Sequence, residues 1–490
     1  MRTNCGTGAP GPLTIVLRCP DRLMARVRYV FDTLLLAAGV PVVYVGEPPS
    51  AGPWLLYASS KDVEAPSPGR VSLAHCPQSW LVFDGPTDIE AQDASGSLPI
   101  VLPRRAAGFS GCCDVDFDLV ANAFYFLSSW SERVGRDPTG NRQLHANSVF
   151  VRLGLPQDIV DRYLDCLLDR IGRACESIGA CPWPRPAWPG GSEYALVLSH
   201  DVDFIPAGPG DIALQGAKTV MRHVLRQRDP LDAMRAAAGW MRAWVAGRDP
   251  YGCVPEIIAR ERELGVRSSF QVAVGHRHPN DVNYRIEDDR VRDYLRVVVD
   301  EGFDLCLHGS YRSTENPRWY VEEARLLARR LTAPLGSRQH FLSFDYDNLF
   351  MAQEEAGIEY DMSIGYPDRA GARAGFSYPY FPYNLREDRP YRVLQISLFL
   401  MDVTLRGYMG LRPAPARQVI DACLADLRRK RGCASAVWHP IVFGGARDPG
   451  YGELYFDMIA SVKATGGLAT DGRTINCFWR DKARRYASFA

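Results

Sequence analysis

Several features that often reveal a protein's class are missing from this sequence. Its formal net charge is +0, and without an excess of positive charge bulk nucleic-acid binding is not expected. The longest apolar run, near residues 33–45, is interrupted by Gly39 and Pro41 and is too short to cross a bilayer. The first residues carry no apolar core of a secretory signal. We therefore expect a cytoplasmic protein that is not an integral membrane protein.

Characteristic cysteine and glycine motifs are missing as well. The thirteen cysteines form no CxxC pairs, so we interpret them as reduced, mostly buried thiols. No glycine-rich phosphate loop follows the first strand, and nucleotide binding is unsupported. There are no internal repeats, and nothing predicts an oligomeric state. A chain of 490 residues nevertheless has ample material for two or more domains.

The pattern of apolar residues predicts an α/β fold. Residues 1–130 begin strand, helix, strand and are expected to form a smaller α/β domain of unknown role. Residues 131–190 read as a helical connector that ends in a proline-rich stretch. In residues 191–490 helices and strands alternate, which predicts a distorted (β/α) barrel of seven or eight units, with a helical insertion at about 209–250.

The stretch YALVLSHDVD, residues 194–203, organises the predicted barrel. Its apolar start is typical of a strand buried on both faces, and Asp201 and Asp203 follow at its end. Two carboxylates two residues apart on extended chain point to the same side. They could cap the next helix or brace a turn. Alternatively, they form a site that needs a metal ion, or one acid and one base.

Histidines at the ends of other strands favour the second interpretation. His308, His340 and His439 each end or follow an apolar strand of the predicted barrel. Together with Asp201 and Asp203 they predict a metal site combined with acid–base groups.

The stretch around Asp201 resembles the first motif of the polysaccharide deacetylases, the NodB-homology domain of carbohydrate esterase family 4. Later stretches resemble the remaining motifs in the right order, over roughly residues 191–480. The resemblance implies that Asp201 is the general base and Asp203 a metal ligand. The family usually has adjacent aspartates, whereas Val202 separates them here, so the two roles could be exchanged.

The second and third motifs are matched in part. LCLHGSYRS resembles the second, which implies that His308 is a metal ligand, but Arg312 stands where the family has a second histidine. RQHF resembles the third, which implies that Arg338 orients Asp201. His340 is additional, and we expect it to be the third ligand; the alternative is a hydrogen bond in the barrel rim.

The last two motifs complete the resemblance. Asp361 resembles the acidic residue of the fourth motif, in a supporting role. Val437, Trp438 and His439 resemble the last, whose histidine is the general acid, with Asp402 as its orienting partner. The residues expected to contact substrate are Tyr311, Tyr366, Arg373 and Trp438.

The chemistry implied is removal of an N-acetyl group from an amino sugar or glycan precursor, with a divalent metal, expected to be zinc. Asp203, His308 and His340 would hold the metal, since zinc takes about three protein ligands. Asp201 would act as base and His439 as acid. Two alternatives stay open: hydrolysis of a small non-sugar C–N bond, and a degenerate carbohydrate-binding protein.

The insertion at 209–250 is basic. It carries six arginines and one lysine between Lys218 and Arg248 against two aspartates, with Trp240, Met241 and Trp244 interleaved. The tryptophans could pack it on the barrel with its arginines in solvent. Alternatively, it is a lid that holds an anionic group such as a phosphate.

Overall fold

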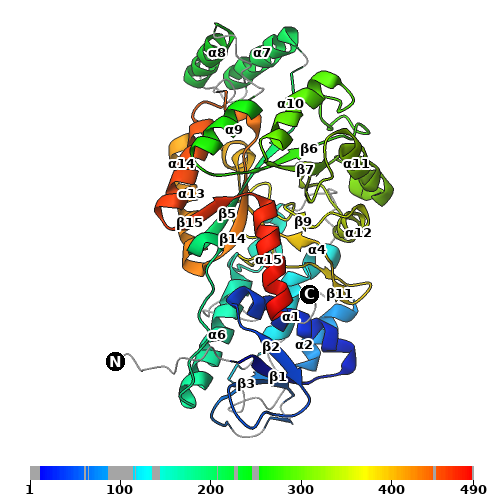
Figure 1. Ribbon diagram of the computed structural model, residues 1–490, viewed down its shortest axis with the longest axis vertical. Helices are drawn as coiled ribbons and strands as arrows, with labels where there is room; N and C mark the ends of the chain where they lie inside the picture. Colours follow the sequence, from blue (N-terminus) through cyan, green and yellow to red (C-terminus); the bar gives the residue numbers. More distant parts are fainter. Residues whose placement is uncertain are drawn as a thin grey trace. The chain divides into compact units, whose positions relative to one another are not determined.

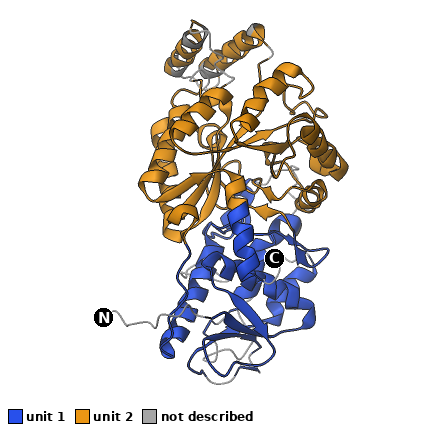
Figure 2. Cartoon of the chain, viewed as in Figure 1, with its two compact units in different colours: residues 1–186, 374–391, 477–490 blue, residues 187–373, 392–476 orange. Residues whose placement is uncertain are grey.

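The computed structural model describes residues 11–59, 62–63, 66–85, 114–115, 117–134, 144–206, 208–225, 230–245, 253–444 and 448–487. The chain divides into two compact units (Figure 2), one of residues 1–186, 374–391 and 477–490, the other of residues 187–373 and 392–476. These units differ from the predicted domains. Residues 131–186 belong to the first unit rather than to a separate connector, and two segments of the predicted barrel, 374–391 and 477–490, belong to it too.

The first unit is built on a parallel four-stranded sheet in the order β2-β1-β3-β4. The strands are β1 (Leu13–Arg18), β2 (Val42–Val45), β3 (Trp54–Ala58) and β4 (Arg70–Ala74). Helix α1 (Met24–Ala38) ends at Gly39, whose φ of +73° gives the left-handed cap that glycine adopts without strain. The strand–helix–strand order predicted for the start of the chain is therefore confirmed.

Short helices and one hairpin complete the first unit. Its helices are α2 (Pro77–Leu81), α3 (Leu119–Leu127), α4 (Trp130–Val134), α5 (Val149–Arg152) and α6 (Ile159–Ser177), and its hairpin pairs β10 (Tyr383–Asn384) with β11 (Arg389–Pro390). Helix α15 (Gly472–Tyr486) begins in the second unit and continues in the first. Cys181 is disulfide-bonded, so the prediction that the cysteines are reduced is wrong at this position.

The second unit is a curled parallel sheet of nine strands (Figure 1). They are β5 (Tyr194–Val202), β6 (Ser269–Val272), β7 (Asp304–Gly309), β8 (Gly336–Gln339), β9 (Tyr360–Asp361), β12 (Leu394–Gln395), β13 (Leu398–Met401), β14 (Cys433–Val437) and β15 (Gly467–Thr470). Their order is β12-β9-β8-β7-β6-β5-β14-β13, and β15 also pairs with β5. Since β12 and β13 follow one another in the chain, the two ends of the sheet are joined by two residues. The predicted barrel-type α/β fold is confirmed.

Helices follow the strands, as expected for parallel strands that need crossovers. They are α9 (Val254–Glu263), α10 (Asp289–Asp300), α11 (Pro317–Arg330), α12 (Tyr346–Ala356), α13 (Pro413–Lys430) and α14 (Tyr451–Ala464). One core cluster packs Tyr194, Leu196 and Leu198 of β5 against Ala434 and Ala436 of β14 and the apolar faces of α13 and α14. This packing fixes the strands whose far ends carry polar residues.

Two apolar stretches of the sequence form shorter strands than their length would predict. The stretch 338–344 leaves the sheet after Gln339 and turns, with positive φ angles at Phe341 (+58°) and Leu342 (+52°). The stretch 391–400 is interrupted at Ile396 and Ser397, and its halves pair with β9 and β14. Periodicity alone does not reveal such breaks, because the residues stay apolar while the neighbouring strand changes.

The insertion consists of α7 (Pro209–Leu225) and α8 (Pro230–Val245). The two predicted helices are confirmed, whereas residues 226–229 and 246–252 lie outside the described residues. A Cβ at Gly216 would lie 2.7 Å from the indole nitrogen of Trp240, so glycine permits this close helix contact. Within the described residues, every helix is too short or too polar to cross a membrane.

Candidate metal and acid–base site

The polar residues singled out in the sequence meet at the carboxyl ends of the parallel strands. Asp201 lies near the end of β5 and Asp203 just beyond it; His308 lies in β7, and Arg338 in β8. His340 directly follows β8, Asp402 follows β13, and His439 lies two residues after β14. Parallel strands bring residues far apart in sequence to one edge, which is where barrel folds carry their sites.

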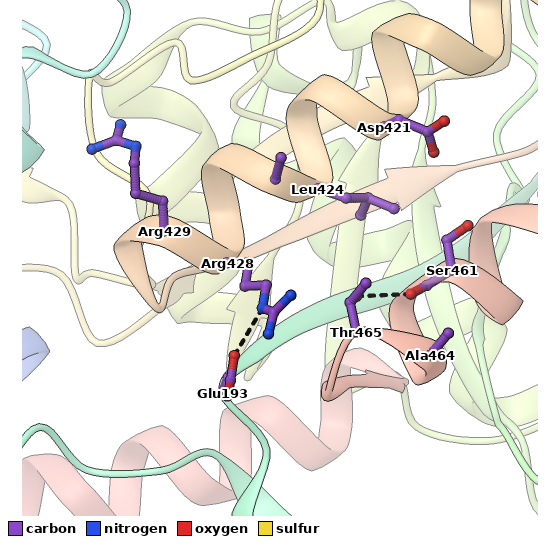
Figure 3. A pocket seen from close by; sticks show the side chains of 9 residues that line it. Glu193, Asp421, Leu424, Arg428, Arg429, Ser461, Ala464 and Thr465 are labelled. Carbon is purple, nitrogen blue, oxygen red and sulfur yellow. Dashed lines mark hydrogen bonds and ion pairs between the residues drawn. The ribbon is translucent and has the colours of Figure 1, made fainter.

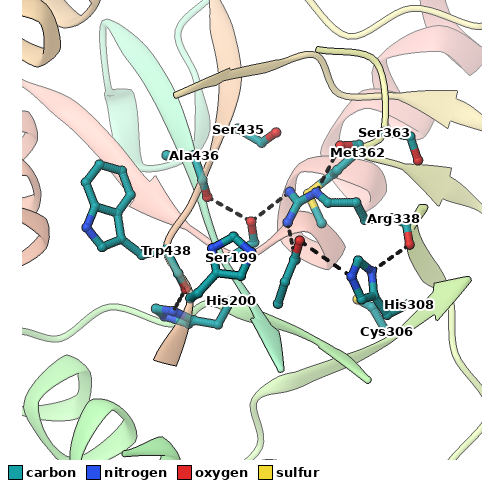
Figure 4. Close-up of polar contacts among 12 residues, drawn as sticks. Ser199, His200, Cys306, His308, Arg338, Met362, Ser363, Ser435, Ala436 and Trp438 are labelled. Carbon is teal, nitrogen blue, oxygen red and sulfur yellow. Dashed lines mark hydrogen bonds and ion pairs between the residues drawn. The ribbon is translucent and has the colours of Figure 1, made fainter. Parts of the chain in front are cut away.

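Arg338 fixes Asp201 in the interior of this site. Its Nη1 donates to Oδ1 of Asp201 at 2.6 Å, its Nη2 to Oγ of Ser199 at 2.8 Å, and its Nε to the carbonyl of Met362 at 3.1 Å. Figure 4 shows Arg338 directed toward Ser199. The Arg338 side chain is completely buried. The guanidinium and the Ser199 hydroxyl thereby hold the Asp201 carboxylate in one orientation.

Three histidines converge on Asp203. His308 Nε2 lies 3.3 Å and His340 Nε2 lies 3.5 Å from its Oδ1, and His439 Nε2 lies 3.4 Å from its Oδ2. The Asp203 side chain is 34% exposed, whereas those of His308 and His340 are 1% and 7% exposed. Asp203 is thus the point at which this cluster meets solvent.

The donor set fits a metal ion. Asp203, His308 and His340 each offer an atom, and these atoms lie within 4.8 Å of one another. His308 Nδ1 lies 2.9 Å from the carbonyl of Arg338, so this nitrogen donates its proton and leaves the lone pair of Nε2 directed at the cluster. Among the described residues, Asp203 Oδ1 and His308 Nε2 are buried and have no hydrogen-bond partner. Ligands of a tetrahedral zinc lie about 3.3 Å apart, close to the nitrogen–oxygen distances from His308 and His340 to Asp203.

The charges of the cluster shift the pKa values of its members. Burial raises the pKa of Asp203, but His340, His308 and His439 outweigh this and hold it well below its usual range. Burial lowers the pKa of His308, and Asp201 and Asp203 raise it above its ordinary value. A cation bound at this place would likewise stabilise the Asp203 carboxylate.

His439 is held by a carboxylate from a neighbouring strand. Its Nδ1 lies 2.6 Å from Oδ1 of Asp402, and Asp402 is completely buried. Burial lowers the pKa of His439, but Asp402, followed by Asp203, raises it to about 9. His439 therefore carries a proton on Nε2, the atom that faces Asp203 and the cluster.

The residues expected to contact substrate differ in how far they are exposed. Tyr311 is half-buried and its ring stacks on His278, with centroids 4.6 Å apart. Phe341, which the sequence did not single out, is 44% exposed and packs its ring against both Tyr311 and His340. These aromatic rings form a rim beside His340.

The prediction that Trp438 contacts substrate is wrong. Its side chain is completely buried in the core cluster, and its indole nitrogen donates to the carbonyl of Tyr451 at 2.9 Å. Tyr366 and Arg373 are also buried, and the Arg373 guanidinium lies over the Tyr366 ring at 5.6 Å. Their contact with substrate stays a prediction. Arg312 is exposed and pairs with Glu315 at 3.4 Å.

Asp361 occupies a buried position stabilised by its own hydrogen bonds. It is completely buried, and its carboxylate accepts hydrogen bonds from Gln353 and from the backbone and side chain of Ser363, each at 2.7 Å. Burial raises the pKa of Asp361 to about 6, and these hydrogen bonds oppose the rise. This placement fits the supporting role proposed from the sequence.

Sequence reasoning missed a buried network next to Asp201. His200 Nδ1 lies 2.8 Å from the carbonyl of Trp438, the residue before His439, and Nε2 lies 3.0 Å from Glu261. Ser268 also donates to Glu261, at 2.7 Å, and so does Tyr455. The ends of β5 and β14 are thereby tied together. Glu261 could not have been found from the sequence, because it lies on a helix far from any motif.

A separate hollow of about 630 Å³ lies at the amino end of β5 (Figure 3). Its rim carries the ion pair of Glu193 and Arg428, at 2.9 Å, and Glu193 directly precedes β5. This hollow therefore lies at the end of β5 opposite to the end that carries Asp201 and Asp203.

Comparison with known proteins finds similarity in structure only. No family model matches the sequence, and no curated protein matches it. Similar solved structures include a protein of Mycobacterium smegmatis described as a polysaccharide deacetylase (18% identity, 61% of this chain and 93% of that chain, TM-score 0.41). An allantoinase (17%, 62% and 95%, 0.41) and a protein of Pseudomonas aeruginosa PAO1 described as a polysaccharide deacetylase (16%, 62% and 96%, 0.41) are also similar.

Proposed function

We propose that this protein is a metal-dependent hydrolase that removes an N-acetyl group from an amino sugar or a glycan precursor. The observation that carries the proposal is the placement of two separately held acid–base groups around one three-donor cluster. Asp201 is held by Arg338 at 2.6 Å, and His439 by Asp402 at 2.6 Å. Asp203, His308 and His340 lie between them.

Asp203, His308 and His340 would hold the divalent metal. Two imidazoles and one carboxylate are a donor set that zinc accepts, with a position left for substrate or water. When bound, such an ion supplies Lewis acidity toward the acetyl carbonyl. The 34% exposure of the Asp203 side chain leaves this cluster open on one side.

The protein's own residues manage the protons of the reaction. Asp201, oriented by Arg338, accepts a proton from the water that attacks the acetyl carbon. His439 donates a proton to the nitrogen as the C–N bond breaks, so that acetate and a free amine leave. Asp402 keeps the Nδ1 proton of His439 in place and directs Nε2 at the reacting atoms. General acid–base groups of this kind contribute about 100-fold or more each.

The aromatic rim supports an amino-sugar substrate. Tyr311 is half-buried and Phe341 is 44% exposed, both beside the cluster. Aromatic rings cover the apolar face of a bound ring while its hydroxyl groups stay in water. We therefore assign Tyr311 and Phe341 to the sugar rather than to the acetyl group.

Hydrolysis of a small non-sugar C–N bond is the second candidate. The burial of His308, Arg338 and Asp201 favours it, because a small amide needs little open surface. A binding protein without catalysis was suggested by Arg312 in place of a ligand. His340 lies beside Asp203 and supplies a third metal donor, which a protein that only binds carbohydrate would not need.

Acetate release tests the proposal. Purified protein loaded with zinc is incubated with N-acetylglucosamine oligosaccharides and, separately, with small amides such as acetamide. Acetate and free amine from the oligosaccharides, abolished by a chelator and restored by zinc, are expected. Turnover of small amides alone would favour the second candidate, and no turnover of either by a zinc-loaded protein would contradict both.

A further inference from the structure

Helices α7 and α8 expose an unusual number of large apolar side chains. Eight of the fifteen large apolar side chains that are exposed in the described chain belong to these two helices. The eight are between 49% and 79% exposed: Leu214, Met221, Val224, Leu225, Leu231, Met234, Met241 and Val245. Single exposed apolar residues are ordinary, but such a concentration indicates a surface that is covered by something else.

The exposed residues form one stripe on each helix. In α7, Leu214, Met221 and Leu225 are seven and four residues apart, and in α8, Leu231, Met234, Met241 and Val245 follow the same helical spacing. The opposite faces pack against each other through small residues: Gly216 and Thr219 of α7, Ala233 and Ala236 of α8 are buried. Apart from Trp240, which packs against Gly216, the described side chains between the helices are small and the large apolar ones lie outside, the reverse of the usual pattern of a water-soluble hairpin.

Five of the eight apolar residues lie in the helical turns nearest the junction of α7 and α8, whereas Leu214, Met241 and Val245 lie farther along the two helices. Met221, Val224 and Leu225 lie in the last turns of α7, and Leu231 and Met234 lie in the first turns of α8. Figure 1 shows the two helices side by side, next to α9 and α10. Because both outer faces are apolar, an occupant has to surround this end rather than cover one side. A lipid surface surrounds this end when the hairpin enters it end-on.

The charge of the hairpin selects among possible occupants. From Pro209 to Val245 the sequence has six basic residues against three aspartates, although the whole chain has a net charge of +0. Lys218 and Arg235 are exposed beside the stripes. A second copy of the chain would bring two positive hairpins together, and a soluble polyanion would leave the apolar stripes in water. An anionic bilayer surface satisfies both the charge and the apolar side chains.

We propose that the α7–α8 hairpin docks this protein on anionic lipid surfaces, with Met221, Val224, Leu225, Leu231 and Met234 entering the headgroup region. Interfacial helices bury their apolar residues by about 5–10 Å, which corresponds to one or two turns at this end of the hairpin. The hairpin rests in the interface, since no described helix is long and apolar enough to cross a membrane. Docking does not depend on the proposed hydrolysis and is measured without substrate.

Vesicle binding by the whole protein tests this proposal. Vesicles of phosphatidylcholine and phosphatidylglycerol in equal parts are compared with vesicles of phosphatidylcholine alone, by sedimentation. We expect binding to the anionic vesicles only, weakened by added salt because surface charges are screened. The variant Met221→Ser/Leu225→Ser/Leu231→Ser/Met234→Ser should bind on the order of 100-fold more weakly.

A matched control carries the same type of change elsewhere. Leu81 and Val151 are 55% and 49% exposed, so Leu81→Ser/Val151→Ser makes the same type of change at two similarly exposed positions outside the hairpin and should leave vesicle binding unchanged. Circular dichroism verifies that both variants are folded. Lys218→Gln/Arg235→Gln should weaken binding to anionic vesicles by roughly 30-fold, about fivefold for each charge removed.

Four results would overturn the proposal. They are absence of binding to anionic vesicles, equal binding to neutral vesicles, the same loss of binding in the Leu81/Val151 control, and unchanged binding in the four-serine variant. If that variant instead turned a dimer into a monomer while still binding vesicles, a second copy would be the occupant.

Discussion

Arg338 and Asp201 form a buried ion pair, 2.6 Å between Nη1 and Oδ1, that turns the other carboxylate oxygen of Asp201 toward the histidines. Oδ2 of Asp201 lies 3.8 Å from His308 Nε2, whereas Oδ1 of Asp203 lies 3.3 Å from the same nitrogen. Asp201 thus already has a cationic partner, whereas within the described residues the ion pairs of Asp203 are all with the histidine cluster. This difference favours Asp201 as the base and Asp203 as the metal ligand, although Val202 separates the two.

Asp201→Asn and His439→Ala should each lower kcat by about 100-fold or more while the protein retains its metal. Neither residue belongs to the three-donor group of Asp203, His308 and His340. Acetate release measures the rate, and elemental analysis of the dialysed protein measures the metal. Should Asp201→Asn empty the site, the roles of Asp201 and Asp203 would have to be exchanged.

Arg338→Met should destabilise the protein by about 3–5 kcal/mol, because it leaves the Asp201 carboxylate buried without its partner. Both side chains are almost completely buried, with 0% and 6% exposed. Urea denaturation of the wild type, the two single variants and the double variant Arg338→Met/Asp201→Asn measures the coupling. The double variant should be more stable than Arg338→Met alone. If the two effects simply add, the ion pair does not hold Asp201 as described.

The strand ends could be predicted from sequence because buried parallel strands are continuous apolar runs, and a polar residue at the end of such a run is conspicuous. That reasoning placed Asp201, His308 and His439 at one edge of the sheet. The expectation for Trp438 came from its place beside His439 in the last motif, which does not tell whether a side chain faces the site or the packed core. Glu261 was missed because its contact with His200 depends on the position of a helix, which no local pattern encodes.

Lys482→Met should stabilise the protein more at pH 6 than at pH 9. Lys482 is 7% exposed, donates to the carbonyl of Ala37 at 3.2 Å and lies 4.7 Å from the ring of Trp479. Burial, with a smaller contribution from Arg185, lowers the pKa of Lys482 from 10.5 to about 7.

The sign follows from proton linkage. Between about pH 7 and pH 10.5 the unfolded chain binds a proton on Lys482 that the folded protein does not, so the free energy of unfolding rises with pH in this window. The difference between wild type and Lys482→Met removes the contributions of all other groups. Chemical denaturation at pH 6 and pH 9 measures it, with Lys463→Met, an exposed lysine, as control. A difference that is the same at both pH values would contradict the lowered pKa.

His340→Ala should cut the metal content sharply and leave the fold intact. His340 Nε2 lies 3.5 Å from Asp203 Oδ1, and its ring packs 4.8 Å from that of His308. Without it, two protein donors remain, fewer than a stable zinc site uses. His340 lies at the start of the turn after β8, in which Phe341 and Leu342 adopt positive φ angles. Backbone strain at non-glycine residues is retained at sites where the geometry has a use.

His278→Ala is the matched control for that variant, since His278 is a histidine of the same rim that stacks on Tyr311 and is not one of the three donors. It should retain the metal, whereas His340→Ala should lose it, and circular dichroism should be unchanged for both. Zinc added back to His340→Ala at increasing concentration should restore activity only at levels well above those for the wild type, because a lost ligand weakens binding without removing Asp201 or His439. A His340→Ala protein with full metal occupancy and normal turnover would show that His340 only packs in the rim, and would direct the search for the third ligand to His276 or His278.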